Sequence, residues 1–427
     1  MTAHDETAQQ EAAQHRTAQQ EAPPEVRHEH SLAEPLHVLD HTTPTHEEHR
    51  LLKEIGPLVP VDADGVRAWV ATTEETARAV LDVRPPLSKH SDEWAALQRG
   101  EVPPDWTLLP MLTAHSMINR DGAEHRRLRG IAATGFTAKR VKAMEPRVTA
   151  ITRRLLDDLA PGSPVDLKER FCHPLPVIVV FELFGITGRD ELDWFSERYA
   201  AQVDGRSSET ARVTASAQVR EALGELVRRR RAEPADDLTS ALVEAGGGGR
   251  CTDEELVGTL DLLLLAGHET TVHALSNTVH ALLTHPVQLA AALAGEHPWS
   301  HVAEVGLRWN GPVRGLRARY AAQDLVVAGA LVRRGEPILV SLAGANRDGA
   351  PFDLSLPQGA GHIGFGVGAH FCLGAALARQ ELEIALRELF GRFPRLRLAV
   401  PEARLRLLGS SVINGLEELP VLLEPGA

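Results

Sequence analysis

The stretch at residues 365–374 reads FGVGAHFCLG, and AALAR follows at residues 375–379. Its cysteine, Cys372, stands in a loop with glycines on both sides, and an amphipathic helix is predicted to begin directly afterwards. Glycine lets the backbone fold tightly and lie close to a flat ligand. The unpaired N–H groups and positive dipole end of the helix would stabilise a thiolate. A lone cysteine is more often a small buried hydrophobe, but the glycines and the following helix favour a ligand-binding thiolate.

With this loop the sequence resembles the cytochrome P-450 superfamily of haem-thiolate monooxygenases, in particular its soluble bacterial members. The resemblance extends over nearly the whole chain apart from the N-terminal tail. It implies that Cys372 is the axial iron ligand of haem b, and a thiolate in that place pushes electron density to the iron and favours O–O cleavage. The resemblance also places these loop residues around the cofactor: Phe365, Gly366, His370 and Gly374.

A second motif, AGHETT at residues 266–271, lies within a helix predicted over residues 254–283. Glycine inside a helix costs about 1 kcal/mol relative to alanine, so Gly267, beside Ala266, is expected to let a planar ligand or dioxygen approach the backbone. The Thr270 hydroxyl is expected to donate to the Ala266 carbonyl and loosen the local hydrogen-bond ladder. The resemblance implies that Glu269 and Thr270 form the acid–alcohol pair that supplies protons. On its own, the motif would be an ordinary helix segment.

Haem carries two propionates, and four basic side chains are candidates to neutralise them. His125 and Arg129 stand four residues apart, on one face of a predicted short helix, where both can donate to one carboxylate. By itself such a pair is usually solvated. The resemblance implies that both bind a propionate, together with Arg319 ahead of a strand and His370 near the cysteine.

The composition excludes some functions. The chain has 427 residues, and 45 basic against 58 acidic side chains give a net charge of −13, which disfavours a nucleic-acid partner. The polar N-terminus argues against a secretory signal, and no apolar run reaches the about 20 residues that would span a membrane. Three cysteines are too few for a disulfide scaffold. We therefore expect a cytoplasmic protein without a membrane span, and a monomer.

The apolar periodicity predicts a mainly α fold with a smaller β portion. The resemblance implies the cytochrome P-450 fold, with haem between the long central helix and the helix after the cysteine. Residues 1–35 are polar and are predicted to be a disordered tail, and residues 36–427 a single domain. Helices are expected at 145–159, 167–184 with a break near Pro174, 209–231, 254–283 and 373–390, and strands at 66–72, 319–327, 337–342 and 404–423.

One segment departs from the family pattern. Residues 301–309 read HVAEVGLRW, so Val305 stands three residues before Arg308, where the family has glutamate, and Glu304 stands four before it. Leu356 stands where the family has a second arginine. Removing one partner of a buried ion network costs about 3–5 kcal/mol, whereas replacing several by apolar groups can be nearly neutral. We therefore expect apolar packing at Val305 and Leu356, with Arg308 bonded to backbone carbonyls or to Glu304. On this hypothesis Val305→Glu improves neither haem content nor stability.

The leading functional hypothesis is a monooxygenase that inserts one oxygen atom of O2 into an apolar small molecule. Its electrons would come from a ferredoxin and ferredoxin reductase, as the resemblance implies. The alternatives are a haem-binding protein without turnover (a ligand carrier, sensor or partner subunit) and a peroxide-driven peroxygenase. The substrate is expected near Leu262, Leu263 and Ala266, the loop at 88–118 and the turn at 410–413. Simple core packing would explain the leucines equally well.

Overall fold

The computed structural model describes residues 30–82, 86–203, 208–315, 318–359 and 361–424. The tail predicted for residues 1–29 lies outside the described residues. Residues 30–35 were expected to belong to the same tail, but Leu32 is buried in an apolar cluster with Trp69 and Ile338. The packed part of the chain thus starts a few residues earlier than expected.

The long helix α13 (Asp253–Thr284) runs through the middle of a large helical region. The sequence predicts its start, because Thr252 caps the helix and forms a reciprocal capping box with Glu255. Buried side chains occur all around α13, as expected of a helix enclosed by others. Its neighbours are α9 (Pro174–Leu183), α11 (Glu209–Ala232), α15 (Trp299–Trp309) and α17 (Ala375–Arg392), and α8 (Glu145–Asp157) packs on α17 and α9.

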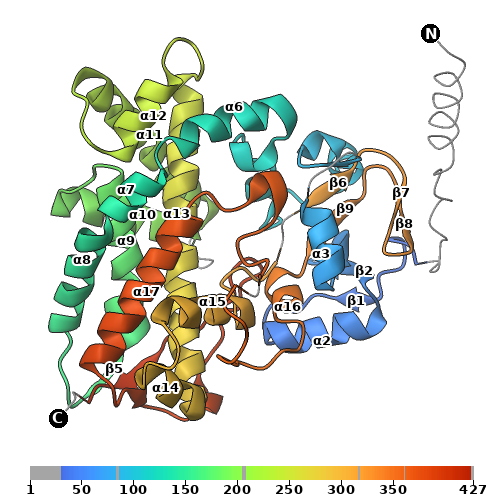
Figure 1. Ribbon diagram of the computed structural model, residues 1–427. Helices are drawn as coiled ribbons and strands as arrows, with labels where there is room; N and C mark the ends of the chain where they lie inside the picture. The colour runs from blue at the N-terminus through green and yellow to red at the C-terminus, as the bar shows by residue number, and fades with distance from the viewer. Residues whose placement is uncertain (1–29, 83–85, 204–207, 316–317, 360, 425–427) are drawn as a thin grey trace, which may run out of the picture.

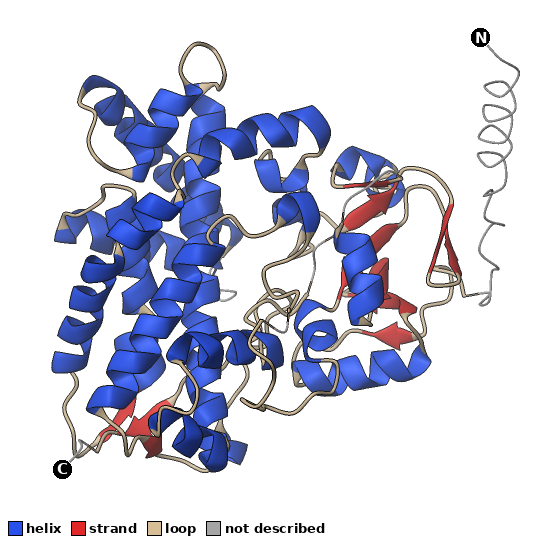
Figure 2. Cartoon of the chain, viewed as in Figure 1, coloured by secondary structure: helices blue, strands red, loops and turns tan. Residues whose placement is uncertain are grey.

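Some of the remaining helices pack around this core and others lie beside the strands (Figure 2). The predicted helix at 167–184 is broken, as expected at Pro174, into a π-helical turn (Lys168–Cys172) and α9. The other helices are α2 (Thr45–Ile55), α3 (Glu74–Leu81), α4 (Ala95–Gln98), α5 (Leu109–Thr113), α6 (Gly122–Ala133), α7 (Ala138–Ala143), α10 (Arg189–Val203), α12 (Leu238–Gly246), α14 (Pro286–Leu293) and α16 (Leu342–Arg347).

A six-stranded sheet forms the other region, in the order β1-β2-β3-β9-β6-β4. Its strands are β1 (His37–Val38), β2 (Leu58–Ala63), β3 (Val66–Ala71), β4 (Leu87–Ser88), β6 (Arg319–Ala321) and β9 (Pro337–Val340). Strands β2 and β3 form an antiparallel hairpin, whose turn residues Asp64 and Gly65 have φ of 55° and 83°. Asp-Gly with positive φ at both positions is the preferred two-residue hairpin turn. Strand β6 places Arg319 at the start of a central strand.

Two smaller sheets account for the other strands, and they correct two predictions. One sheet has the order β10-β11-β5 (Arg397–Leu398, Pro420–Leu422, Pro164–Asp166), and the other pairs β7 (Leu325–Val327) with β8 (Ala330–Val332). The single strand predicted at 319–327 is wrong, because β6 and β7 belong to different sheets. The strand predicted at 404–423 is largely irregular, with an isolated bridge between Leu407 and Leu416 before β11.

The predicted strand at 337–342 ends at Val340, and Leu342 begins α16. The predicted fold class, mainly helical with a smaller β portion, is confirmed. Among the described residues, no helix is long and apolar enough to cross a bilayer.

Candidate active site

The loop around Cys372 is a series of tight turns ahead of α17. Gly366 and Gly368 have φ of 77° and 68°, in the left-handed region that favours glycine. The backbone N–H of Cys372 donates to the carbonyl of Phe365 at 2.8 Å and so closes the loop on itself. Helix α17 begins at Ala375, two residues later than predicted, and Gly374 precedes it as the N-cap. The half-buried Cys372 therefore lies close to the N-terminal end of a long helix.

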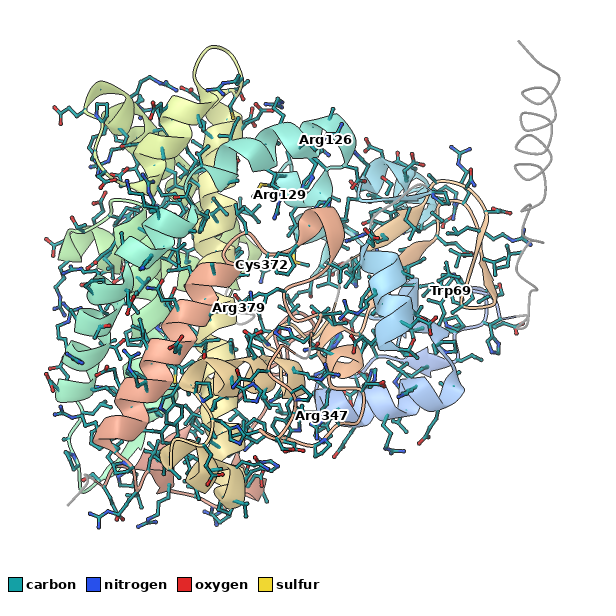
Figure 3. All side chains as sticks on the ribbon, in the orientation of Figure 1. Trp69, Arg126, Arg129, Arg347, Cys372 and Arg379 are labelled. Atoms are coloured by element: carbon teal, nitrogen blue, oxygen red, sulfur yellow. The ribbon has the colours of Figure 1, made fainter. Side chains whose placement is uncertain are left out.

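Helix α6 brings His125 and Arg129 to this loop, as the four-residue spacing predicts. Arg129 Nη2 donates to the carbonyl of Phe371 at 2.6 Å, and Figure 3 shows its side chain beside Cys372. Burial lowers the pKa of Arg129, and the nearby Cys372 thiol partly offsets that effect. The His125 ring lies 4.1 Å from the His370 ring, measured between centroids. Burial, followed by the charges of His370 and Arg129, lowers the pKa of His125 to about 4.

Arg319 reaches the same cluster from β6 and is 1% exposed. Its Nη1 donates to the carbonyl of Ala318 at 3.0 Å and its Nη2 to that of Leu81 at 3.2 Å. Burial lowers the pKa of His370, and the charges of Arg319 and Lys89 lower it further, while Asp121 opposes them. The structure thus brings all four predicted basic residues together.

Lys89 and Asp121 belong to this cluster although the sequence did not single them out. The Asp121 carboxylate accepts from the backbone N–H of Lys89 at 2.5 Å and from the Ser88 hydroxyl at 3.1 Å. Its other oxygen lies 3.5 Å from His370 Nε2. Lys89 donates from Nζ to the carbonyl of Ala318 at 3.2 Å. Asp121 could have been suspected from its place as the N-cap of α6, whereas Lys89 sits in an irregular loop with no distinguishing pattern.

The AGHETT segment presents Ala266 and Thr270 on one face of α13. Ala266 is exposed although Leu264 and His268, on the same helix, are buried. The Thr270 hydroxyl donates to the Ala266 carbonyl at 2.9 Å, which confirms the predicted bond. Gly267 also serves the packing of the helices: a Cβ there would lie 3.2 Å from Val180 Cγ2 of α9, so the glycine lets α9 approach α13 closely. Its expected role beside a ligand stays a prediction.

Glu269 lies between two histidine rings on the same helix. Its carboxylate oxygens are 3.6 Å from His268 Nε2 and 3.7 Å from His273 Nε2. Burial raises the pKa of Glu269, but the two histidines outweigh burial and hold the pKa well below its usual range. His268 Nδ1 donates to the carbonyl of Leu264 at 2.7 Å, which fixes the ring. The four-residue spacing of Glu269 and His273 could have revealed this partner.

The residues that are expected to contact the substrate are only partly exposed. Leu262 and Leu263 pack against a cluster formed by Met117, Leu128 and Ala132, so core packing accounts for much of their contact. The turn at 410–413 is closed by the Ser410 hydroxyl, which accepts from the backbone N–H groups of Val412 and Ile413. A substrate role for these residues stays a prediction.

The charged residues of α15 follow one of the two expected arrangements. Arg308 Nη1 donates to the backbone carbonyl of Gly361 at 2.5 Å, and its Nη2 lies 3.6 Å from Glu74 Oε2. Glu304 bonds Arg379 and His362 instead of Arg308. Val305 is buried in the main core, as expected.

The structure corrects the prediction of apolar packing at Leu356. Leu356 is only half-buried, and Leu354, two residues earlier, packs into the main core. The loop therefore inserts a different side chain from the one that the family pattern indicated.

These residues fit a haem with a thiolate ligand. The sulfur is half-buried near a helix N-terminus, which favours the anionic form that iron binds. Arg129, Arg319, His125 and His370 converge beside it and match two propionates in charge and donor type.

Comparisons with known proteins agree with this site. The family model described as Cytochrome P450 matches residues 207–293 and 302–399. The chain is also 38% identical over 392 residues to 2-hydroxy-5-methyl-1-naphthoate 7-hydroxylase from Streptomyces carzinostaticus, a match that covers 89% of this chain and 95% of that relative. The chain therefore belongs to the cytochrome P450 family and is one of its haem-dependent monooxygenases.

Two further relatives show how far the likeness extends. Cytochrome P450 107B1 from Saccharopolyspora erythraea is 40% identical over 375 residues, which are 85% of this chain and 91% of the relative. The solved structure of testerone-bound CYP154C4 from Streptomyces sp. ATCC 11861 superposes with a TM-score of 0.86 at 37% identity, and covers 91% of this chain and 98% of that one. The expected P450 fold is thus confirmed.

Proposed function

We propose that the chain binds haem b through Cys372 and inserts one oxygen atom of O2 into an apolar small molecule. The observation that carries the proposal is the convergence on Cys372 of α17, Arg129 and the other basic side chains. When bound, haem activates O2: one oxygen atom enters the substrate and the other leaves as water, with consumption of two electrons and two protons.

The basic cluster would fix the cofactor by its propionates. Arg319 is suited to this task because two of its nitrogens are already oriented by backbone carbonyls. Arg129, half-buried and close to the thiol, would bond a propionate and also favour the thiolate electrostatically. His125 stays neutral near pH 7 and would donate a hydrogen bond from one ring nitrogen.

Glu269 and Thr270 would move protons to the reacting oxygen. The Thr270 hydroxyl donates to the Ala266 carbonyl, so its lone pairs remain available to accept a proton or a water molecule. The Glu269 carboxylate, ionised beside His268 and His273, would pass protons onward and regain them from His273 Nε2. A protein that only stored haem would not need this relay, which favours turnover over a carrier or sensor.

The relatives supply the class of substrate. One is named for a methylated hydroxynaphthoate and another was solved with a steroid, both compact ring systems. We propose a substrate of similar size and polarity, bound against the exposed Ala266 face of α13. Electrons would come from a ferredoxin and its reductase, the donors that the resemblance to soluble bacterial members implies.

The decisive experiment uses purified holoprotein. The reduced carbonyl adduct is expected to absorb at the position typical of thiolate-ligated haem, and a panel of steroids, terpenoids and polyketides is screened for the spin shift of displaced iron-bound water. NAD(P)H consumption coupled to product, with a reconstituted ferredoxin chain, supports the monooxygenase. A colourless protein, or an adduct like that of a histidine-ligated globin, overturns the cofactor proposal. Haem without coupled turnover points to a carrier or sensor, and turnover with peroxide alone to a peroxygenase.

A further inference from the structure

Glu304 on α15 is the centre of a polar cluster directly behind the cysteine loop. Its Oε1 accepts from Arg379 Nε at 2.7 Å, and its Oε2 accepts from Arg379 Nη2 at 3.1 Å. His362 Nε2 lies 3.2 Å from the same Oε2. Because His362 Nδ1 accepts from the backbone N–H of Gly364 at 3.0 Å, Nε2 carries the proton and donates to Glu304. The carboxylate therefore joins α15, α17 and the segment that enters the loop.

The same residues hold the ring of Phe365. The Arg379 guanidinium carbon lies 4.5 Å from the centroid of that ring, a cation–π arrangement. The His362 ring lies 5.6 Å from it on centroids. Since the carbonyl of Phe365 accepts from the backbone N–H of Cys372, the contacts lead from Glu304 through Arg379 and Phe365 to the cysteine. Figure 3 shows Arg379 near the start of α17 and Cys372 just beyond it.

The geometry indicates that this cluster orients the side chains beside the cysteine loop and contributes little to the free energy of unfolding. The side chains of Glu304 and Arg379 are 33% and 41% exposed, and an ion pair that reaches solvent to this extent adds little to the free energy of unfolding. Burial raises the pKa of Glu304, but His362 and Arg379 outweigh burial and lower it to about 2. The carboxylate is thus ionised throughout the neutral range, and its planar two-point pairing with arginine fixes orientation.

We infer that Glu304, Arg379 and His362 form a clamp that positions Phe365 and thereby the Cys372 thiolate toward iron. The inference rests on the proposed haem ligation by Cys372. The three are positioning residues, because they act on Cys372 through Phe365 and the backbone of the loop. In the family pattern this helix carries an acid at the place of Val305, and here the adjacent Glu304 connects to the loop by a different route.

The test compares two matched bidentate pairs that both include a residue of α17. Arg379→Lys and Glu304→Gln alter the clamp. Arg153→Lys and Glu388→Gln alter the control pair, in which Arg153 Nε and Nη2 donate to Glu388 at 2.7 and 3.2 Å, well along α17 from the loop. The measurement is the fraction of reduced carbonyl adduct that lacks the thiolate-type band, with the haem reduction potential and the melting temperature recorded in parallel.

The clamp variants are expected to raise the fraction without a thiolate band about tenfold over wild type, the effect of one lost charged hydrogen-bond pair. Their reduction potential should shift while the melting temperature stays that of the control variants. Phe365→Leu, which removes the ring and keeps an apolar side chain, should give the same spectral change. If the clamp variants and Phe365→Leu keep wild-type spectra and potential, the inference is wrong. If wild type itself lacks the thiolate band, the proposed ligation fails before the clamp is tested.

Discussion

The two sides of the candidate active site are held together in different ways. On α13, Thr270 bonds Ala266, and Glu269 is flanked by His268 and His273, so their closest polar partners lie on the same helix. The Glu269 charge also acts on Lys168 and His173, just before α9. Around Cys372, the contacts come from α6, α15, α17 and β6. The proton-handling side is therefore built locally, and the metal-binding side is assembled from segments far apart in the chain. Substitutions of side chains distant in sequence should therefore act mainly on the cysteine side.

The largest effect is expected from Cys372→Ser. Loss of the sulfur should abolish the thiolate-type carbonyl spectrum completely, because a serine hydroxyl does not supply the same electron density to iron. The matched control is Cys251→Ser, which changes another half-buried cysteine, in the turn before α13. A thiolate-type spectrum that survives Cys372→Ser, or disappears in Cys251→Ser, would assign the ligand to another residue.

Glu269→Gln tests the proton-handling side, on α13. The amide cannot carry the proton, so the rate of coupled product formation should fall about 100-fold, the lower range for loss of a general acid–base group. The carbonyl spectrum should be unchanged, because no contact of Glu269 reaches the cysteine loop. Glu254→Gln, on the exposed first turn of the same helix, serves as the control. A normal rate, or a lost thiolate spectrum, contradicts the division into two independently built sides.

Arg319→Gln tests the metal-binding side, at a residue that does not belong to the cysteine loop. Loss of a buried charged donor should weaken haem retention about tenfold, measured as transfer of haem to apomyoglobin. The control is Arg333→Gln, on the exposed hairpin of β7 and β8, with its side chain 63% exposed. Equal haem loss from both variants would remove Arg319 from the propionate cluster.

The smallest effect at neutral pH is expected at His125, whose protonation changes stability only in the acid range. Folding lowers its pKa from 6.5 to about 4, so between these values the unfolded chain binds a proton that the folded chain does not. Stability therefore rises with pH in this window and is lost as pH falls from 6.5 toward 4, by at most about 1.4 kcal/mol per pH unit. In haem-free protein, His125→Gln should flatten this slope, whereas an unchanged slope would assign the proton to another group.

The local side was also the side that the sequence predicted well. The capping box at Thr252 and Glu255, the periodicity of α13 and the Thr270–Ala266 bond all depend on residues within a few positions of one another. The glycines around Cys372 predicted the loop and, to within two residues, the start of α17, because these features also depend on residues close together in the sequence.

The parts that sequence reasoning missed depend on distant partners. Glu304 pairs with Arg379, 75 residues further along, and no periodicity relates the two. The break between β6 and β7 is another example. Asp324, between these two strands, accepts from the backbone N–H of Arg334, ten residues further along and beyond β8. The packing role of Gly267 was missed because its neighbour, Val180, belongs to another helix.

The contact between Gly267 and Val180 has a mechanical consequence. Val180 packs against the glycine, so a shift of α9 along α13 would bring Val180 into steric conflict with the larger residues on either side of Gly267. The position of α13 along its axis is thereby constrained on a side of the helix other than the Ala266–Thr270 face. Thr270, three residues further along the same helix, is therefore held in register by a contact in which it takes no part.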